Sequence, residues 1–102
     1  MYPKLAREVP ELEALSIKIA EQSPGAATVE FVRHVVVATA PALFESRCAA
    51  CPDGMHDFTG DLRRGLRGGE ARIVGECVCN GFHGAAACGC VLSYEASTTY
   101  RW

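Results

Sequence analysis

Six cysteines in two groups are the residues of this chain best able to do chemistry. The segment GECVCNGFHGAAACGC, residues 75–90, holds four of them as two Cys-x-Cys pairs on either side of an eight-residue loop. The segment CAACPDGMH, residues 48–56, holds the other two and a histidine. Thiolate sulfur and imidazole nitrogen are ligands that zinc prefers in proteins. The candidate metal ligands are therefore Cys48, Cys51, Cys77, Cys79, Cys88, Cys90 and His56.

The redox environment decides how such cysteines are interpreted. The first 22 residues, MYPKLAREVPELEALSIKIAEQ, carry charges throughout and contain no continuous apolar stretch, so they predict no secretory signal. The longest apolar run, VVVATAPALF, is too short to span a bilayer. The sequence therefore predicts a cytoplasmic protein with no membrane partner. In a reducing compartment, clustered cysteines favour metal binding or redox chemistry over structural disulfides.

The segment that begins at Cys48 resembles the retroviral-type zinc knuckle. Its spacing is Cys48-x2-Cys51-x4-His56-x4-Asp61, with an aspartate as the last ligand. It also has Pro52 where that family has a glycine after the second cysteine. Two thiolates separated by two residues converge readily on one ion. The resemblance implies a local zinc site and, by analogy with that family, RNA binding.

The second group of cysteines lies on two predicted strands. Residues 70–79 and 88–97 alternate in side-chain type, which predicts a β-hairpin with all four thiols on its buried face. If Cys79 lies opposite Cys88, the other two thiols also face one another, and the four could close around one ion. Alternatively, one thiol from each strand joins the Cys-x2-Cys pair, an arrangement that resembles the four-cysteine site of a zinc ribbon. One zinc ion, two zinc ions, and no metal with cross-strand disulfides all remain open.

The N-terminal half must position these loops, and its pattern favours helices. Leu12, Leu15 and Ile19 recur at helical spacing within residues 10–22. Residues 26–39 are ambiguous, because VRHVVVAT is rich in β-branched residues and also fits a buried strand. We favour a helix there, which gives a helical hairpin.

The resulting fold prediction is a single α+β domain over residues 1–102. A helical part, residues 1–47, precedes a cysteine-rich metal-binding β part, residues 48–102. The second part consists of a zinc-stapled loop and an antiparallel β-hairpin. Between them, the glycines of residues 65–71 predict an irregular loop.

Two further segments are suited to binding a partner. The segment DLRRGLRGGEAR places arginines beside glycines, and TTYRW ends the sequence with aromatic residues. Arginine and the large aromatic residues dominate the energetics of protein interfaces. The candidate partner-binding residues are Arg63, Arg64, Arg67, Tyr100 and Trp102.

Charge and motifs narrow the predicted function. The net charge is −2, which is no footprint of a general nucleic-acid binder, and no nucleophile signature is present. We expect a small, non-catalytic, zinc-stabilised protein that binds a macromolecule, most simply a protein. A phage or mobile-element inhibitor of a host system, of the anti-CRISPR or anti-defence type, fits this profile. The alternatives are a nucleic-acid-binding zinc module or transcription regulator that uses the arginines, and a thiol-dependent enzyme.

Overall fold

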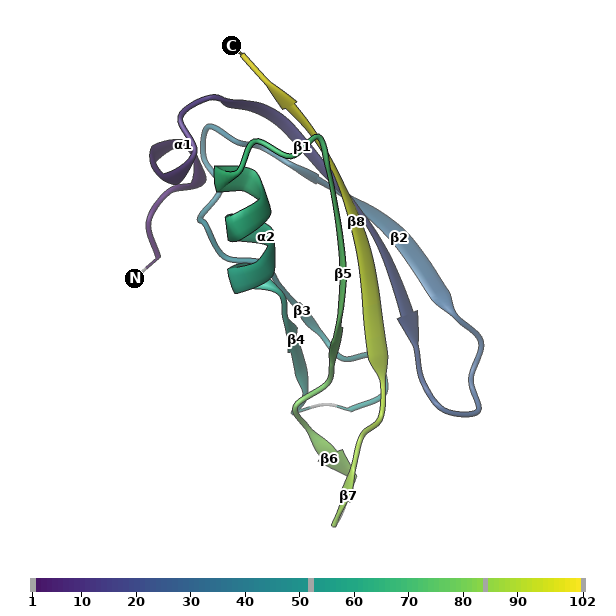
Figure 1. Cartoon of the computed structure of the whole chain (residues 1–102). Coiled ribbons are helices and arrows are strands. Elements are labelled where there is room, and N and C mark those ends of the chain that lie inside the picture. Colours follow the sequence, from purple (N-terminus) through teal and green to yellow (C-terminus); the bar gives the residue numbers. More distant parts are fainter. Residues whose placement is uncertain (1, 52, 84, 102) are drawn as a thin grey trace.

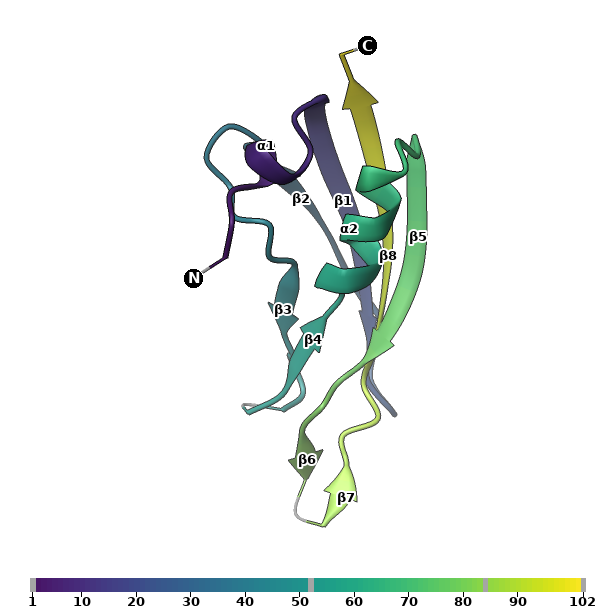
Figure 2. The same ribbon diagram turned by 60° about the vertical axis from the view of Figure 1, so that its left-hand side comes forward.

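The chain forms a four-stranded antiparallel sheet with its longer helix on one face (Figures 1 and 2). The computed structural model describes residues 2–51, 53–83 and 85–101. The strand order in the sheet is β2-β1-β8-β5, and β3–β4 and β6–β7 form separate two-stranded ribbons. In chain order the elements are α1 (Leu5–Glu8), β1 (Leu12–Gln22), β2 (Val29–Val35), β3 (Glu45–Arg47), β4 (Met55–Asp57), α2 (Thr59–Arg67), β5 (Arg72–Val78), β6 (Phe82–His83), β7 (Ala86–Ala87) and β8 (Val91–Tyr100).

The predicted N-terminal helical hairpin is wrong, because both of its segments are strands. β1 and β2 pair antiparallel over their whole common length. Leu12, Leu15 and Ile19 do fit a helical spacing, but Ile17 lies between the last two and completes an alternation. Leu15, Ile17 and Ile19 are all buried, whereas the residues between them are not. For β2 the alternative interpretation, a strand favoured by β-branched residues, is the correct one.

The C-terminal strands pair antiparallel as predicted, but in a different register. β5 pairs with β8 so that Cys77 lies opposite Leu92 and Val78 opposite Val91. Beyond this ladder, the amide of Cys79 donates a hydrogen bond of 2.9 Å to the carbonyl of Cys90. The chain between the two strands continues outward as the β6–β7 ribbon. Cys79 is therefore the neighbour of Cys90 and not of Cys88 across the hairpin.

Helix α2 replaces the first part of the predicted irregular loop. It extends to Arg67, so that Gly65 is helical. A side chain at Gly65 would place its Cβ 2.8 Å from Ile73, so the glycine allows the helix to lie close to β5. Leu62 and Leu66 on the same helix are fully buried against the sheet. No helix in the described part of the chain is long and apolar enough to cross a bilayer.

The hydrophobic core lies between the sheet and the elements on this face. Phe58 stacks on Tyr94 of β8 with ring centroids 4.7 Å apart and on Phe44 at 6.3 Å. A second buried cluster, built from cysteines, lies apart from this core. The sheet face that carries Lys18 and Val74 is exposed. The fold therefore has an apolar core under α2 and a separate thiol cluster.

Replacing two neighbouring residues of β1 tests the correction from helix to strand. Ile17→Ala should lower the free energy of unfolding by about 2–5 kcal/mol, because the side chain is fully buried. Lys18→Ala should change it by less than about 0.5 kcal/mol, because Lys18 points to the exposed face. Urea unfolding followed by circular dichroism measures both. Equal losses for the two variants would contradict the assigned alternation.

Candidate metal centre

Five of the six cysteines converge near one end of the sheet. Cys48 and Cys51 lie in the loop between β3 and β4, Cys79 directly follows β5, and Cys88 and Cys90 lie just before β8. Each of the five is at most 7% exposed. All six cysteines are free thiols in the structure. A loop and the two sides of a hairpin more than 25 residues further along the chain are thus held together around a group of buried sulfur atoms.

Cys77 is the predicted ligand that the structure does not bring to this cluster. It is half-buried and packs against the hydrophobic core. Burial, and then the negative charges of Asp57 and Asp61, raise its pKa to about 11. The predicted alternation holds as far as Val78, the last residue of β5. Beyond that residue the chain leaves the sheet and carries Cys79 toward the other thiols.

Three of the converging sulfur atoms are close enough to one another to share a metal ion. The Sγ atoms of Cys48 and Cys88 are 3.7 Å apart. A tetrahedral zinc ion with Zn–S bonds of about 2.3 Å has S···S edges of about 3.8 Å. The Sγ of Cys79 lies within 4.8 Å of both. Cys51 lies beside this group without belonging to it: a Cβ built at Gly54 would lie 3.1 Å from the Cys51 sulfur and 2.2 Å from that of Cys79, so both sulfurs border the space next to Gly54.

Backbone amides support these sulfur atoms. The amide of Gly81 donates a hydrogen bond of 3.3 Å to the Sγ of Cys79, and the amide of Ala50 donates to that of Cys48. Burial disfavours the thiolate of Cys48, but this amide and the neighbouring thiols outweigh burial and lower its pKa. By contrast, burial and the neighbouring sulfurs raise the pKa of Cys79 to about 12.

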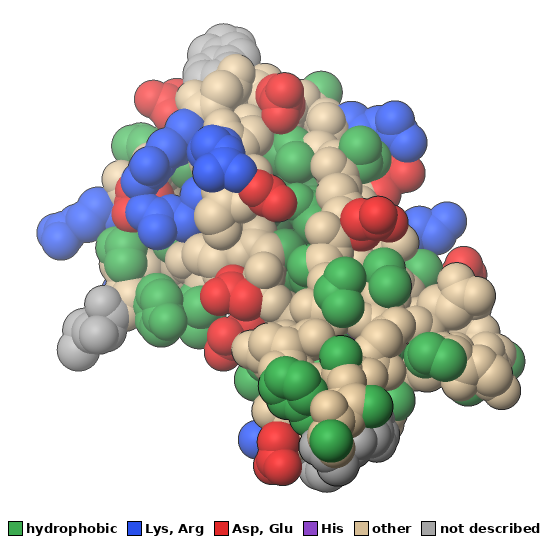
Figure 3. All heavy atoms as spheres, turned by 60° about the horizontal axis from the view of Figure 1, so that its bottom comes forward, with side chains coloured by type: hydrophobic (Ala, Val, Ile, Leu, Met, Phe, Trp, Pro, Cys, Tyr) green, Lys and Arg blue, Asp and Glu red, His purple; other side chains and the backbone are tan. Residues whose placement is uncertain are grey.

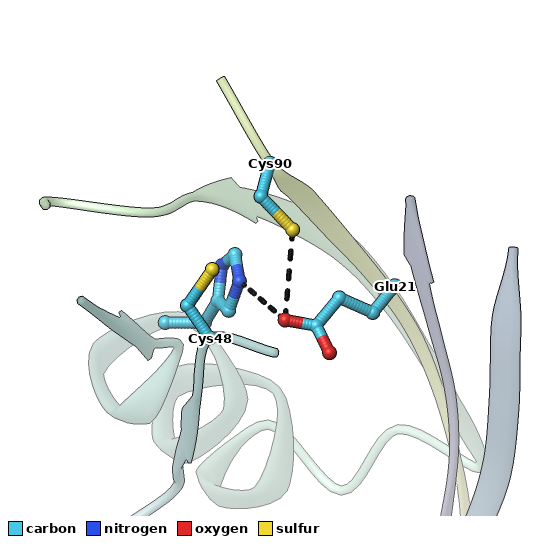
Figure 4. A group of neighbouring side chains, drawn as sticks. Glu21, Cys48 and Cys90 are labelled. Carbon is cyan, nitrogen blue, oxygen red and sulfur yellow. Dashed lines mark hydrogen bonds and ion pairs between the residues drawn. The ribbon is translucent and has the colours of Figure 1, made fainter. Parts of the chain in front are cut away.

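A buried carboxylate and a buried imidazole lie beside the thiols. His56 of β4 is fully buried, and its Nε2 lies 3.0 Å from the Oε1 of Glu21. The same oxygen accepts hydrogen bonds from the amide of Ala49 at 3.0 Å and from the thiol of Cys90 at 3.5 Å. Figure 4 shows Glu21, Cys48 and Cys90 pointing toward one another. The cluster thus combines sulfur, nitrogen and oxygen donors.

Sequence reasoning missed Glu21. A helical reading of its segment hid the fact that position 21 continues the buried alternation of Ile17 and Ile19. A charged residue in register with a buried strand face was the signal that could have identified it. The knuckle resemblance had instead pointed to Asp61, but Asp61 lies on α2, is exposed and forms an ion pair with Arg64. His56 therefore joins the cluster without the aspartate of that motif.

The predicted partner-binding arginines lie together on α2. Figure 3 shows basic side chains next to acidic ones on this side of the molecule. Arg63 and Arg67 both form ion pairs with Glu8. The hydrogen bond from Arg67, opposed by partial burial but aided by the charges of both arginines, lowers the pKa of Glu8. Their positive charge is thus partly neutralised within the protein.

The two aromatic candidates lie elsewhere. The hydroxyl of Tyr100 donates a hydrogen bond of 2.8 Å to the carbonyl of Glu70, which ties the end of β8 to the segment before β5. Trp102 lies outside the described residues. The structure therefore gives Tyr100 a role in the fold and leaves the predicted role of Trp102 in binding as a prediction.

Comparison of the chain with protein-family models, with curated proteins and with solved structures found no match. The interpretation of the cluster accordingly depends on its own geometry and donor chemistry.

Two glycine substitutions test the packing of the cluster. Gly54→Ala would place a methyl group 2.2 Å from the Sγ of Cys79, so we expect it to displace that sulfur and reduce metal binding at least tenfold. Gly60→Ala is the matched control, because nothing lies within 4 Å of its Cβ and alanine favours the helix by up to about 1 kcal/mol. Competition with a chromophoric chelator measures the affinity. Equal affinities in the two variants would show that the Cys79 sulfur is not held at a metal.

Proposed function

We propose that this chain is a zinc-stabilised binding protein without catalytic activity and that it acts on another protein. The observation that carries the proposal is the convergence of five buried thiols from three chain segments. In this proposal Cys48, Cys79 and Cys88 hold a zinc ion, and a side-chain movement brings in the neighbouring Cys51 as its fourth ligand. Their combination, one Cys-x2-Cys loop and two cysteines from a hairpin, is the arrangement that the sequence resemblance to a zinc ribbon implied.

The donor set favours zinc in a structural role. Thiolates suit Zn²⁺, and four of them complete its preferred tetrahedron. A catalytic zinc ion needs a position open to water or substrate, and a four-thiolate cage leaves none. The ligands are also buried, which protects them from outside reactants. These features support a metal that stabilises the fold.

Zinc would stabilise the part of the molecule that has least apolar packing. The hydrophobic core consists of residues outside the cysteine cluster, mostly under α2. Near the cluster the chain forms loops and short ribbons of two or three residues per strand. A structural zinc site contributes apparent free energies on the order of 10 kcal/mol, part of which stabilises the fold. The ion would fix the β3–β4 loop to the ends of β5 and β8.

Two cysteine substitutions test the zinc site. Cys51→Ser should reduce the affinity for zinc by at least a factor of 10 and lower the melting temperature, because it removes one of the four thiolates. Cys77→Ser should leave the zinc affinity unchanged, because Cys77 packs against the apolar core. Elemental analysis and chelator competition on protein purified without added metal provide the measurement. Zinc below about a tenth of an equivalent in the wild-type protein would contradict the proposal.

The cysteine cluster supports an exposed aromatic residue. Phe82 of β6 is 65% exposed, and Val78 at the end of β5 is 61% exposed. Figure 3, which views the molecule from the β6–β7 end, shows hydrophobic side chains gathered there. The carbonyl of Phe82 lies 3.8 Å from the Sγ of Cys51. The amide of the preceding residue, Gly81, donates a hydrogen bond to the Sγ of Cys79. An aromatic side chain held on such a support is suited to fill a pocket of a protein partner.

The arginines give weaker support to the nucleic-acid alternative. Affinity for nucleic acids depends on cationic side chains that neutralise phosphates. Here Arg63 and Arg67 bind Glu8, and Arg64 binds Asp61. A partner with phosphates would have to displace these carboxylates. The expected role as an inhibitor of a host system stays a prediction about the identity of the protein partner.

Two phenylalanine substitutions test the proposed contact surface. Phe82→Ala should weaken binding of a protein partner by about 2 kcal/mol or more, as removal of a central aromatic anchor does. Phe31→Ala is the matched control, because Phe31 is 41% exposed on β2, outside the β6–β7 ribbon. Both variants should retain zinc and fold.

The measurement compares proteins captured from cell lysate by immobilised wild type and variants, followed by titration of the captured partner. A partner that binds Phe82→Ala as tightly as the wild type would remove the β6–β7 ribbon from the interface. Captured nucleic acid, with an affinity that falls steeply with salt, would instead support the nucleic-acid alternative.

A further inference from the structure

We propose that the cluster holds a second metal ion, bound by Glu21, Cys48, His56 and Cys90, and that the thiolate of Cys48 bridges the two ions. This inference rests on the proposed zinc site, which it extends to a binuclear centre. The ligand atoms of these four residues all lie within 4.8 Å of one another, and all four residues are buried. They come from β1, the β3–β4 loop, β4 and the segment before β8.

The distances between these donor atoms agree with the edges of a coordination tetrahedron. The Sγ of Cys90 lies 3.5 Å from the Oε1 of Glu21. Zn–S and Zn–O bonds of about 2.3 and 2.0 Å at the tetrahedral angle give an S···O edge of about 3.5 Å. The Nε2 of His56 lies 3.0 Å from the same oxygen, compared with an N···O edge of about 3.3 Å. Small side-chain movements would place all of these donors on one ion.

Burial of the charged and polar groups calls for a cation. Glu21 is 5% exposed and His56 is fully buried. Within the described residues, the imidazole of His56 is the only ion-pair partner of Glu21. Enclosing a carboxylate among thiols with a single imidazole beside it is unfavourable without further compensation. A divalent ion provides it, because it attracts the carboxylate and accepts electron pairs from sulfur and nitrogen.

The number of donors also fits two ions. The cluster contains five buried cysteines, one imidazole and one carboxylate. Two tetrahedral ions that share one bridging thiolate require seven donors. Cys48 is the residue common to both groups of neighbouring ligand atoms. Binding of the second ion releases the thiol proton of Cys90 to solvent, and the carboxylate of Glu21 coordinates without further change. The Nε2 of His56 must also give up the proton that it shares with Glu21: a neutral imidazole moves this proton to Nδ1, and an imidazolium releases it to solvent.

Metal counting by native mass spectrometry and elemental analysis tests the proposal. We expect two zinc ions in the wild-type protein and in the Cys77→Ser control. His56→Ala and Cys90→Ser should each retain one ion, because the four-cysteine site does not need these residues. Cys48→Ser should lose the bridging ligand and bind less than one ion. The zinc affinity of the remaining site in His56→Ala should stay within threefold of that of the tighter wild-type site.

Cadmium NMR of the wild-type protein adds a measurement that needs no variant to fold. Protein loaded with ¹¹³Cd should give two signals, one from an all-sulfur site and one from a site with nitrogen and oxygen ligands. If the wild type binds one zinc ion and gives one all-sulfur cadmium signal, and both results are unchanged in His56→Ala, the second site is overturned and the first stays intact. If the wild type holds a single ion, and this ion is lost in His56→Ala but retained in Cys51→Ser, the binuclear centre is overturned. The ion would then be assigned to the site formed by Glu21, Cys48, His56 and Cys90. Absence of bound metal would overturn both proposals.

Discussion

The position of Cys48 beside the other buried thiols constrains most of this structure. Its sulfur lies 3.7 Å from that of Cys88, although forty residues separate the two along the chain. For this contact to form, the β3–β4 ribbon must lie against the end of the sheet where β5 and β8 separate. That placement also brings His56 to Glu21, because His56 belongs to β4 and Glu21 to the last part of β1. The thiol cluster and the ion pair are thus consequences of one docking arrangement.

The molecule divides its stabilisation between two kinds of interaction. Under α2, burial of Leu62, Leu66 and the stacked rings of Phe58 and Tyr94 supplies a conventional apolar core. At the cysteine cluster, small thiols are buried together with an imidazole and a carboxylate, and the last two lower stability unless they are compensated. A chain of 102 residues has limited apolar area to bury, so the proposed metal would be an effective second source of stability. The molecule is elongated, with extents of 48 × 28 × 19 Å.

The sequence predicted the donor chemistry better than the architecture. Spacing alone identified Cys48, Cys51 and His56 as possible ligands, because ligand type and local separation are visible along the chain. The helical interpretation of β1 failed because positions 12, 15 and 19 fit a helical spacing, whereas only 15 and 19 fit strict alternation. Leu12 is buried with them across an irregularity of the strand between Leu12 and Ala14, and Ile17 is the residue that indicates a strand. The same error concealed Glu21, whose importance depends on which face of the strand is buried. Cys77 was grouped with the ligands because alternation was extended past the point where β5 ends, and no local signal marks that end.

The β6–β7 ribbon connects the metal cluster to the proposed function. Its backbone contacts the cluster at Gly81 and Phe82, whereas the Phe82 side chain points to solvent. If the sulfurs of Cys51 and Cys79 are fixed by an ion, the residues bound to them are fixed as well. A partner would then meet an aromatic residue on a backbone that is already ordered, so less entropy would be lost on binding. If the proposed function holds, metal occupancy and partner affinity are expected to change together, although the ion would be enclosed by its ligands and would not contact the partner.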